Sequence, residues 1–419
     1  MTATLSPPSG TPSHTAPASR RYRVLTIASH VVQYASPVFR EMARHPQLDL
    51  TVAYCSLQGA EAGLDAEFGT TVQWDVPLLD GYRWMQVPNR SLRSGLGHFF
   101  GLWNPSLWGT IRSGAYDAVM LLTGYMYASF WIALLAAKLS GVPVFFGTDA
   151  TSLDPMAGPR WKRHLKALVL PRIFALADVA IAASSATQTY LESLGVASQR
   201  VAIMPLVVDN EWWLARAAAA DRSTVRARWG IPAQAPVVLF CAKLQPWKRP
   251  HDLLQAFARA DVPGAYLVFA GEGSLRPELE KETARLGLNA RTRFLGFVNQ
   301  TALPEIYTAA DLFVLPSRYD ACPAVVCETM LCGTPAVISD QIRGRFDLIA
   351  PGGTGFIFPC GDVDALSAIL RSALRDPGRL AQLGKAARAR MGSCSPAHNV
   401  ANFVAALARL CTERSAQSS

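Results

Sequence analysis

Short apolar runs rich in β-branched residues alternate along this chain with longer stretches of helical periodicity. The runs that we predict as strands include residues 24–28, 50–54, 118–122, 142–146, 179–182, 237–241 and 266–270. Helical patterns fill the gaps, among them 36–45, 128–140, 160–176, 250–260 and 362–412. Strands that alternate with helices build parallel sheets covered on both faces. The pattern therefore predicts an α/β protein.

The strand–helix pattern pauses near residues 205–209 and then restarts. A chain of 419 residues is too long for one hydrophobic core. We therefore predict two doubly wound, Rossmann-like domains, 21–207 and 208–392, with a cleft between them where the carboxyl ends of the strands can hold a ligand. Residues 1–20 are predicted to be a disordered tail. Residues 393–419 are predicted to be a C-terminal helix that can pack back on the first domain.

Composition narrows the class of partner. Half of the residues are hydrophobic, and the net charge of +9 suits an anionic ligand, an anionic membrane surface or nucleic acid. Nucleic acid is not expected, since no basic run is interleaved with aromatic residues and no zinc-finger spacing occurs. No apolar stretch is long enough to span a bilayer, and the eight cysteines form no Cys-x-x-Cys pair. We expect a cytoplasmic protein, either soluble or attached peripherally to the inner face of a membrane.

A loop with two lysines follows the first strand of the second half. Lys243 and Lys248 lie five residues apart, and Pro250, a residue type favoured at the start of helices, opens the next helix. Two cations beside a helix N-terminus make a good site for a diphosphate. Taken alone, the loop is explained equally well as a solvated basic turn.

Two acids bracket an apolar run between two predicted buried strands, 311–316 and 336–339. Asp320 lies in the loop at the carboxyl edge of the first strand, and Glu328 lies on the following helix, which we predict over residues 323–332. Carboxylates at these positions can accept hydrogen bonds from the hydroxyls of a sugar and a ribose. For a helix on its own, a capping role for Asp320 and a paired surface position for Glu328 would be preferred.

The start of that helix is a second candidate anion site. The first backbone amides of a helix have no acceptor within the helix. We therefore predict that the amides of Pro323, Ala324 and Val325 meet a phosphate group.

The second half carries an ordered series of further motifs. They are Ala242-Lys-Leu-Gln-Pro-Trp-Lys248, Ala270-Gly-Glu-Gly-Ser-Leu-Arg276, Arg293-Phe-Leu-Gly-Phe297, Leu303-Pro-Glu-Ile-Tyr307, Ala310-Asp-Leu-Phe-Val-Leu-Pro-Ser317, the two acids separated by seven residues, Cys332-Gly-Thr-Pro335 and Gly352-Gly-Thr-Gly-Phe356. In this order, from about residue 235 to 390, the chain resembles the group 1 glycosyltransferases, also called family 4, of the retaining GT-B class.

The resemblance implies a role for each candidate residue of the second half. Lys243 and Lys248 would hold the donor diphosphate, Glu328 would bind the ribose, and Asp320 would contact the donor sugar. The family usually has Glu at this first acid, so the shorter Asp implies a change in donor choice or positioning. Gly296 and Phe297 fall where the family places the nucleotide base.

The first half matches the family less closely. Asp149 stands where the family often carries a His near the reaction centre, so we hypothesise a catalytic role for it; a loop Asp bonded to nearby backbone is the alternative. His30 follows the first strand and is interpreted either as a contact to acceptor or phosphate or as a hydrogen-bonded loop histidine. The basic stretch 160–172 suits either an anionic membrane surface or a helix with one solvated face. The aromatic segment 98–108 suits either a lipid or glycan acceptor site or ordinary packing.

The resemblance thus implies transfer of a sugar from a nucleoside diphosphate sugar to an acceptor hydroxyl on a glycan, a lipid or a small molecule. It implies retention of anomeric configuration and no resident metal or other cofactor. Hydrolysis with the two acids as acid and base would leave the lysines without a purpose. A nucleotide-sugar epimerase of the same architecture, or a non-catalytic sugar-nucleotide-binding subunit, would also be compatible with these residues.

Overall fold

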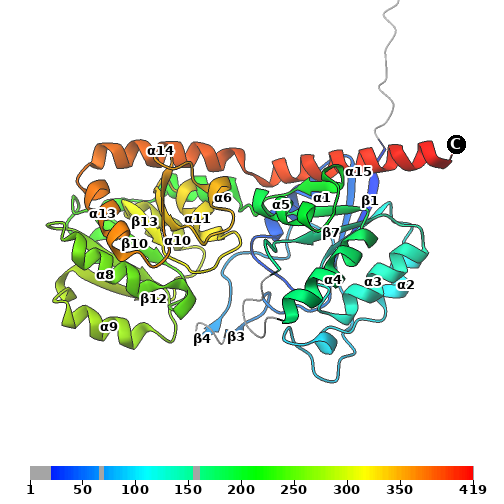
Figure 1. Cartoon of the computed structure of the whole chain (residues 1–419), viewed down its shortest axis with the longest axis horizontal. Helices are drawn as coiled ribbons and strands as arrows, with labels where there is room; N and C mark the ends of the chain where they lie inside the picture. Colours follow the sequence, from blue (N-terminus) through cyan, green and yellow to red (C-terminus); the bar gives the residue numbers. More distant parts are fainter. Residues whose placement is uncertain (1–19, 66–69, 154–160, 419) are drawn as a thin grey trace, which may run out of the picture.

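The computed structural model describes residues 20–65, 70–153 and 161–418, which form two α/β domains next to each other (Figure 1). The first domain has a seven-stranded parallel sheet in the order β5-β2-β1-β6-β7-β8-β9. These strands are β1 (Tyr22–Ala28), β2 (Leu48–Tyr54), β5 (Trp84–Gln86), β6 (Ala118–Leu122), β7 (Val144–Thr148), β8 (Val179–Ala182) and β9 (Val201–Ile203). A separate antiparallel hairpin is formed by β3 (Gly63–Asp65) and β4 (Thr70–Val72).

Helices cover both faces of the first sheet. One face is covered by α2 (Leu107–Ser113), α3 (Ala128–Leu139), α4 (Trp161–Leu176) and α5 (Ser185–Ser193), and the other by α1 (Ser36–Arg44) and α15 (Pro396–Ser418). Buried strands need this double cover because both faces of a parallel sheet are apolar.

The second domain has a six-stranded parallel sheet in the order β12-β11-β10-β13-β14-β15. Its strands are β10 (Val237–Cys241), β11 (Tyr266–Ala270), β12 (Thr292–Gly296), β13 (Leu312–Leu315), β14 (Ala336–Ser339) and β15 (Gly355–Phe358). One face packs against α6 (Asn210–Ala219), α10 (Leu303–Ala309), α11 (Ala324–Leu331) and α14 (Pro377–Ser393), and the other against α8 (Pro250–Ala260), α9 (Arg276–Arg285) and α13 (Val363–Leu374). The shorter α7 (Arg222–Arg228) and α12 (Arg345–Leu348) complete the domain.

Both sheets confirm the predicted doubly wound topology. Strand order runs outward in two directions from a central pair, β1–β6 in the first sheet and β10–β13 in the second. The connections from the two central strands leave in opposite directions, so a crevice opens at their carboxyl ends. Ligands of doubly wound sheets bind in that crevice.

Prolines account for two differences from the predicted elements. The strand predicted at 142–146 begins at Val144, because Pro143 has no N–H for the ladder; its carbonyl instead accepts a 2.9 Å hydrogen bond from Val119. The single helical pattern predicted at 362–412 is three helices, since α14 and α15 each restart at a proline, Pro377 and Pro396.

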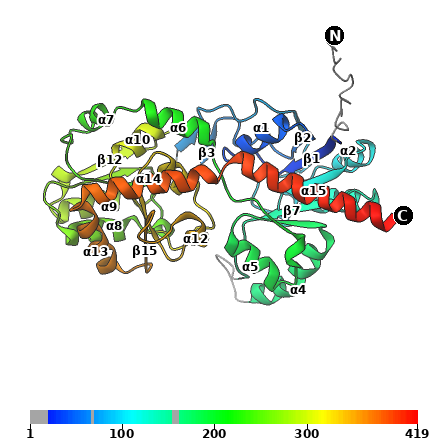
Figure 2. The ribbon, with the colours of Figure 1, turned by 90° about the horizontal axis from the view of Figure 1, so that it is seen from above.

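The chain crosses between the domains twice, near residues 205–209 and again between α14 and α15. These two helices run one after the other along one side of both domains (Figures 1 and 2). The Asn210 amide donates to the carbonyls of Met391 and Cys394 at 3.0 and 3.1 Å, and the Asn399 amide donates to Pro205 at 2.7 Å. These bonds hold the two crossings together along one edge of the domains.

Candidate active site between the domains

The lysine loop and the first acid meet at the carboxyl edge of the second sheet. Since β10 and β13 are neighbours, the loops that follow them lie beside each other. Lys248 Nζ lies 2.6 Å from Asp320 Oδ2, and the Arg318 N–H donates to the carbonyl of Trp247 over 2.7 Å. Both side chains of the ion pair are only 17% exposed. Lys243 lies half-buried earlier in the same loop. The loop is therefore not a freely solvated basic turn.

Two glycines allow the lysine loop to pack this closely. Gly271 and Gly273 follow β11 with φ of 147° and 155°. A Cβ at either position would lie within 2.1 to 2.4 Å of the carbonyl oxygens of Ala242 and Leu244. The Leu244 N–H in turn donates to Glu272 at 2.8 Å. The Gly-Glu-Gly turn thus supports the lysine loop from behind.

Helix α11 begins one residue later than predicted. Pro323 is its N-cap with extended backbone, and the helix runs from Ala324 to Leu331. Because proline has no N–H, Pro323 cannot donate to a phosphate, so the prediction for that residue is wrong. Ala324 and Val325 remain as first-turn donors. Asp320 is not the cap, as no side chain caps this helix.

Glu328 is buried inside the second domain, so its interpretation as a paired surface acid is wrong. Its side chain is held by the Tyr307 hydroxyl at 2.9 Å and by Gln300. Burial raises the pKa of Glu328 to about 7, and the hydrogen bonds from Tyr307 and Gln300 offset part of that rise. The centre of the Trp213 ring lies 5.7 Å from that of the Tyr307 ring, so Trp213 packs against the residue that bonds to Glu328.

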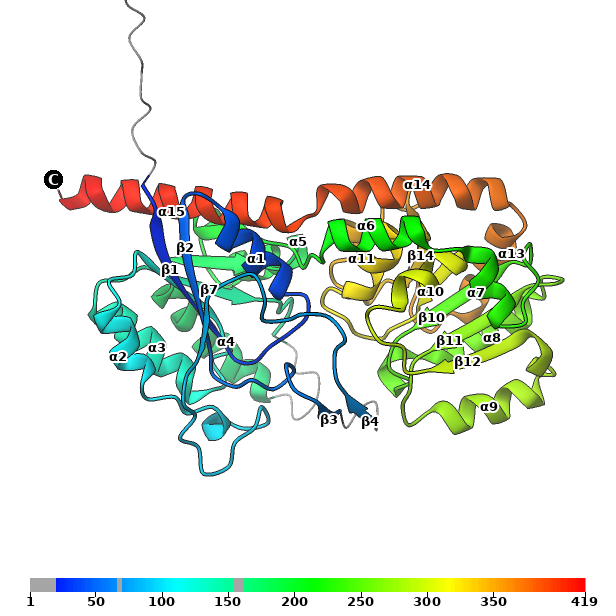
Figure 3. The ribbon, with the colours of Figure 1, turned by 180° about the vertical axis from the view of Figure 1, so that it is seen from behind.

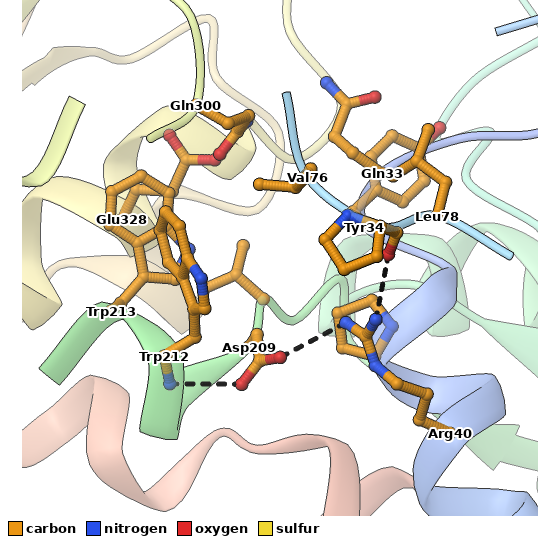
Figure 4. A pocket seen from close by; sticks show the side chains of 13 residues that line it. Gln33, Tyr34, Arg40, Val76, Leu78, Asp209, Trp212, Trp213, Gln300 and Glu328 are labelled. Atoms are coloured by element: carbon orange, nitrogen blue, oxygen red, sulfur yellow. Dashed lines mark hydrogen bonds and ion pairs between the residues drawn. The ribbon is translucent and has the colours of Figure 1, made fainter. Parts of the chain in front are cut away.

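A cavity of about 130 Å³ lies between the domains beside Glu328 (Figure 4). Tyr34 and Arg40 line it from the first domain, and Glu328 and Trp212 from the second. The Arg40 guanidinium lies 3.2 Å from Asp209 Oδ2, which closes the cavity near the domain crossing. Ligand pockets are usually several times larger. A nucleotide sugar would therefore need the cleft to open or to extend toward the loop of Lys248.

The first domain presents two predicted residues toward this cleft. Asp149 follows β7 and is exposed. Burial raises the pKa of Tyr319, beside Asp320 in the second domain, and the Asp149 carboxylate raises it further. Asp149 therefore lies near enough to the loop of Asp320 to act electrostatically on Tyr319. His30 follows the central strand β1, with Nδ1 2.9 Å from Ser29 Oγ, and burial lowers the pKa of its imidazole.

Gly296 and Phe297 lie at the carboxyl end of β12. Gly296 has φ of 73°, and a Cβ there would lie 3.0 Å from Glu272 Oε1. The Phe297 ring lies 6.3 Å from the ring of Trp74, which belongs to the first domain. An aromatic pair from the two domains therefore stands at the position expected for a nucleotide base.

Hydrogen bonds flank this aromatic pair. The Asn299 amide donates to the carbonyl of Gln73 at 2.6 Å, and the Thr301 N–H donates to Asp75 at 3.1 Å, with the Thr301 hydroxyl bonded to the same carboxylate. We name residues 73–75 the interdomain latch. The hairpin β3–β4, which comes directly before these residues in the chain, stands between the domains (Figure 3).

The stretch Asp362-Val-Asp364 has the Asp-x-Asp pattern that can hold a divalent metal, but both side chains have structural contacts. Asp362 caps α13 by accepting the Ala365 N–H at 2.8 Å, and Asp364 lies 2.6 Å from Arg259. Within the described residues, no group of three or more His, Cys, Asp or Glu side chains is arranged to hold a metal ion. The expectation that no metal is required stays a prediction.

Two family models match the two halves of the chain. The model of the glycosyl transferase 4-like domain matches residues 31–207, and that of the group 1 glycosyl transferases matches residues 221–390. The chain belongs to the group 1 glycosyltransferases.

Relatives of this glycosyltransferase include the D-inositol 3-phosphate glycosyltransferase of Streptomyces avermitilis, 35% identical over 41% of this chain and 39% of that protein. The chain thus aligns with well under half of that relative. The enzyme of the same name from Rhodococcus erythropolis is 26% identical over 87% of this chain and 86% of its own. The crystal structure of HepE from Anabaena with UDP-glucose has a TM-score of 0.68 at 20% identity and covers 92% of this chain and all of that one. This likeness confirms the GT-B fold.

Sequence reasoning missed several residues of the candidate site. Tyr307 and Gln300 hold Glu328, and Arg40 joins the domains, yet none was singled out by the sequence. Tyr307 is the last residue of the motif 303–307, one of those that carry the family resemblance, so the sequence could have indicated it as a candidate. The interdomain latch lies in a long connection without periodicity, and its sequence carries no such indication.

Glu328→Gln should stabilise the protein at high pH. With a folded pKa of about 7 and an unfolded value near 4.5, this carboxyl costs stability as pH rises from about 4.5 to 7, and the cost is full above 7. The variant lacks this cost. The difference in melting temperature between the variant and the wild type should therefore increase from about pH 5 to pH 8. The increase should correspond to about 1–3 kcal/mol in the free energy of unfolding. Calorimetric melts test this, with Glu413→Gln, an exposed acid on α15, as control. A difference that does not change with pH would contradict the burial argument.

Asp75→Ala should loosen the contact between the domains without unfolding either one. The change removes both bonds from Thr301 to the latch, and exposed hydrogen bonds contribute only about 0.5–1.5 kcal/mol to stability. We expect a larger radius of gyration by X-ray scattering and a nearly unchanged melting temperature. Asp80→Ala, an exposed acid just beyond the latch, is the control. Equal radii for wild type and Asp75→Ala would show that other contacts hold the domains together.

Proposed function

We propose that this glycosyltransferase moves a sugar from a nucleoside diphosphate sugar to an acceptor hydroxyl, with retention of anomeric configuration and without a metal. The observation that carries the proposal is the meeting of Lys248 and Asp320 at the carboxyl edge of the two central strands. A cation that suits phosphate and a carboxylate that suits sugar hydroxyls lie side by side there, in the crevice where doubly wound sheets bind ligands.

Charge on the leaving group is the main chemical problem of such a transfer. The diphosphate gains negative charge as its bond to the sugar breaks. Lys243, Lys248 and the first amides of α11 at Ala324 and Val325 would stabilise that charge from positions that are set before the reaction begins. Preorganised donors of this kind are usually the largest contribution to catalysis.

The two acids divide the donor between them in this proposal. Asp320 accepts hydrogen bonds from the sugar, and Glu328 accepts them from the ribose. Lys248 exchanges its ion pair with Asp320 for a contact to the diphosphate when the donor enters. The base lies near Phe297, and Trp74 of the first domain closes over it.

Retention follows if the acceptor attacks the face from which the diphosphate departs. The acceptor oxygen forms the new bond to the anomeric carbon, the bond from that carbon to the phosphate oxygen breaks, and the acceptor proton passes to the departing phosphate. No protein nucleophile is needed. Asp149, which lies near the loop of Asp320, orients the acceptor hydroxyl.

The named relatives support the class of donor. HepE of Anabaena, which shares the fold, is known as a complex with UDP-glucose. We infer from this that the donor here is a nucleoside diphosphate sugar.

Removal of either lysine should abolish most turnover while the fold survives. Loss of one preorganised donor typically costs about 3 kcal/mol, so Lys243→Ala and Lys248→Ala should each lower kcat about 100-fold. Lys385→Ala, an exposed lysine on α14, is the matched control. Unchanged turnover in a folded Lys248→Ala protein would remove the diphosphate role from this loop.

Donor binding is the first measurement to make. Calorimetric titration with UDP, GDP and ADP in the presence of a chelator should show one nucleotide that binds, and Glu328→Ala should weaken it. Nucleoside diphosphate should then be released from the matching donor only when an acceptor is present, and NMR of the product gives its anomeric configuration. Conversion of the donor without acceptor would point to an epimerase, and binding without any release to a non-catalytic subunit.

A further inference from the structure

Exposed apolar side chains are distributed very unevenly over the two domains. In the part of the chain that the structure describes, seventeen large hydrophobic side chains are exposed, and fifteen of them lie between residues 34 and 176 of the first domain. The described part of the second domain exposes one, Phe346. The two domains have similar folds, so the difference does not follow from the architecture. A surface of this kind on one domain marks an interaction site.

Helix α4 carries the clearest part of this surface. Leu170, Ile173 and Phe174 face the core, as expected for a helix packed on a sheet. The outward side should then be polar. Instead Trp161, Leu165 and Leu168, spaced four and three residues apart, are 59%, 49% and 58% exposed.

Helix α3 continues the apolar surface. It covers the same face of the sheet as α4, with side chains from both helices in one core cluster. Its outward residues Leu135 and Leu139 lie one turn apart and are exposed. Figure 1 shows α2, α3 and α4 together on the side of the first domain that is remote from α15. We name Leu135, Leu139, Trp161, Leu165 and Leu168 the apolar face.

The charged residues on the helices of this side of the domain have one sign. Together, α2, α3 and α4 contain six lysine or arginine residues and no Asp or Glu. Four of the cations belong to α4, namely Lys162, Arg163, Lys166 and Arg172. Lys138 of α3 is paired with Asp178 outside these helices. A protein partner would usually meet a mixture of charges, whereas a bilayer with acidic head groups presents apolar chains beneath a layer of negative charge.

We propose that the apolar face is a docking surface for an anionic lipid bilayer, with Trp161, Leu165 and Leu168 in the acyl region and Arg163, Lys166 and Arg172 at the lipid phosphates. No helix among the described residues is both long and apolar enough to cross a membrane. The binding that we propose is peripheral. The proposal does not depend on the proposed reaction, because it concerns binding alone.

Co-sedimentation of the full chain with vesicles tests the docking surface. The protein should pellet with vesicles of phosphatidylcholine mixed with phosphatidylglycerol, much less with phosphatidylcholine alone, and less at high ionic strength. Leu165→Ser with Leu168→Ser should lower the partition coefficient about tenfold or more, as should Arg163→Gln, Lys166→Gln and Arg172→Gln together. These five residues lie outside the candidate active site, so calorimetric nucleotide binding should not change.

Matched variants on the second domain are the controls. Phe346→Ser removes its exposed apolar side chain, and Arg375→Gln, Arg379→Gln and Lys385→Gln together remove three exposed cations. Neither control should alter vesicle binding. Wild-type protein that stays in the supernatant with both vesicle types would overturn the proposal.

Sedimentation velocity supplies a second criterion. A protein that docks on a bilayer through this face should sediment as the same species with and without Leu165→Ser and Leu168→Ser. A wild-type dimer that these two substitutions convert to monomer, without vesicle binding, would assign the face to a second copy of the chain instead.

Discussion

The parallel register of the second sheet is the constraint on which the candidate site depends. Hydrogen bonding between β10 and β13 brings the ends of both strands to one edge, although Lys248 and Asp320 are 72 residues apart in the chain. Only there can the two side chains meet. The glycines after β11 are part of the same requirement, because a side chain at Gly271 would push against the backbone of the lysine loop. The chemistry of the site therefore depends on the strand order and on close backbone packing together.

Glu328 shows that the site is maintained at a cost to stability. A buried carboxylate is unfavourable unless it is hydrogen-bonded, and here Tyr307 and Gln300 compensate for burial only in part, since the pKa remains near 7. A glutamine would fit the same position without that penalty. The presence of an ionisable group in a folded core is easier to explain by a ligand that needs an acceptor than by packing. Stability and function are often opposed in this way at binding sites.

Periodicity predicts most of the fold because buried parallel strands form uninterrupted apolar runs, and the strand expected at 237–241 matches β10 to the residue. Where the local chemistry of proline prevails, at Pro143 and Pro396, element boundaries move. The candidate residues of the second half are found because they lie in short motifs in a fixed order. The contacts of Asp75 and Arg40 are not found, since they join segments from different domains and depend on how two folded bodies meet. Local sequence does not carry that information.

The two domains differ in the polarity of their surfaces and in the groups that they bury. The second domain has a surface of ordinary polarity and a buried acid supported by aromatic rings, features that suit a small, charged, soluble ligand. The first domain exposes large apolar side chains on α3 and α4, and its candidate residues His30 and Asp149 follow the strands β1 and β7. A large acceptor that is anchored elsewhere needs such an arrangement, because the acceptor cannot diffuse into a closed cavity. If the proposed reaction holds, opening of the cleft requires release of the interdomain latch, while the paired crossings near residues 205–209 and between α14 and α15 keep the domains together.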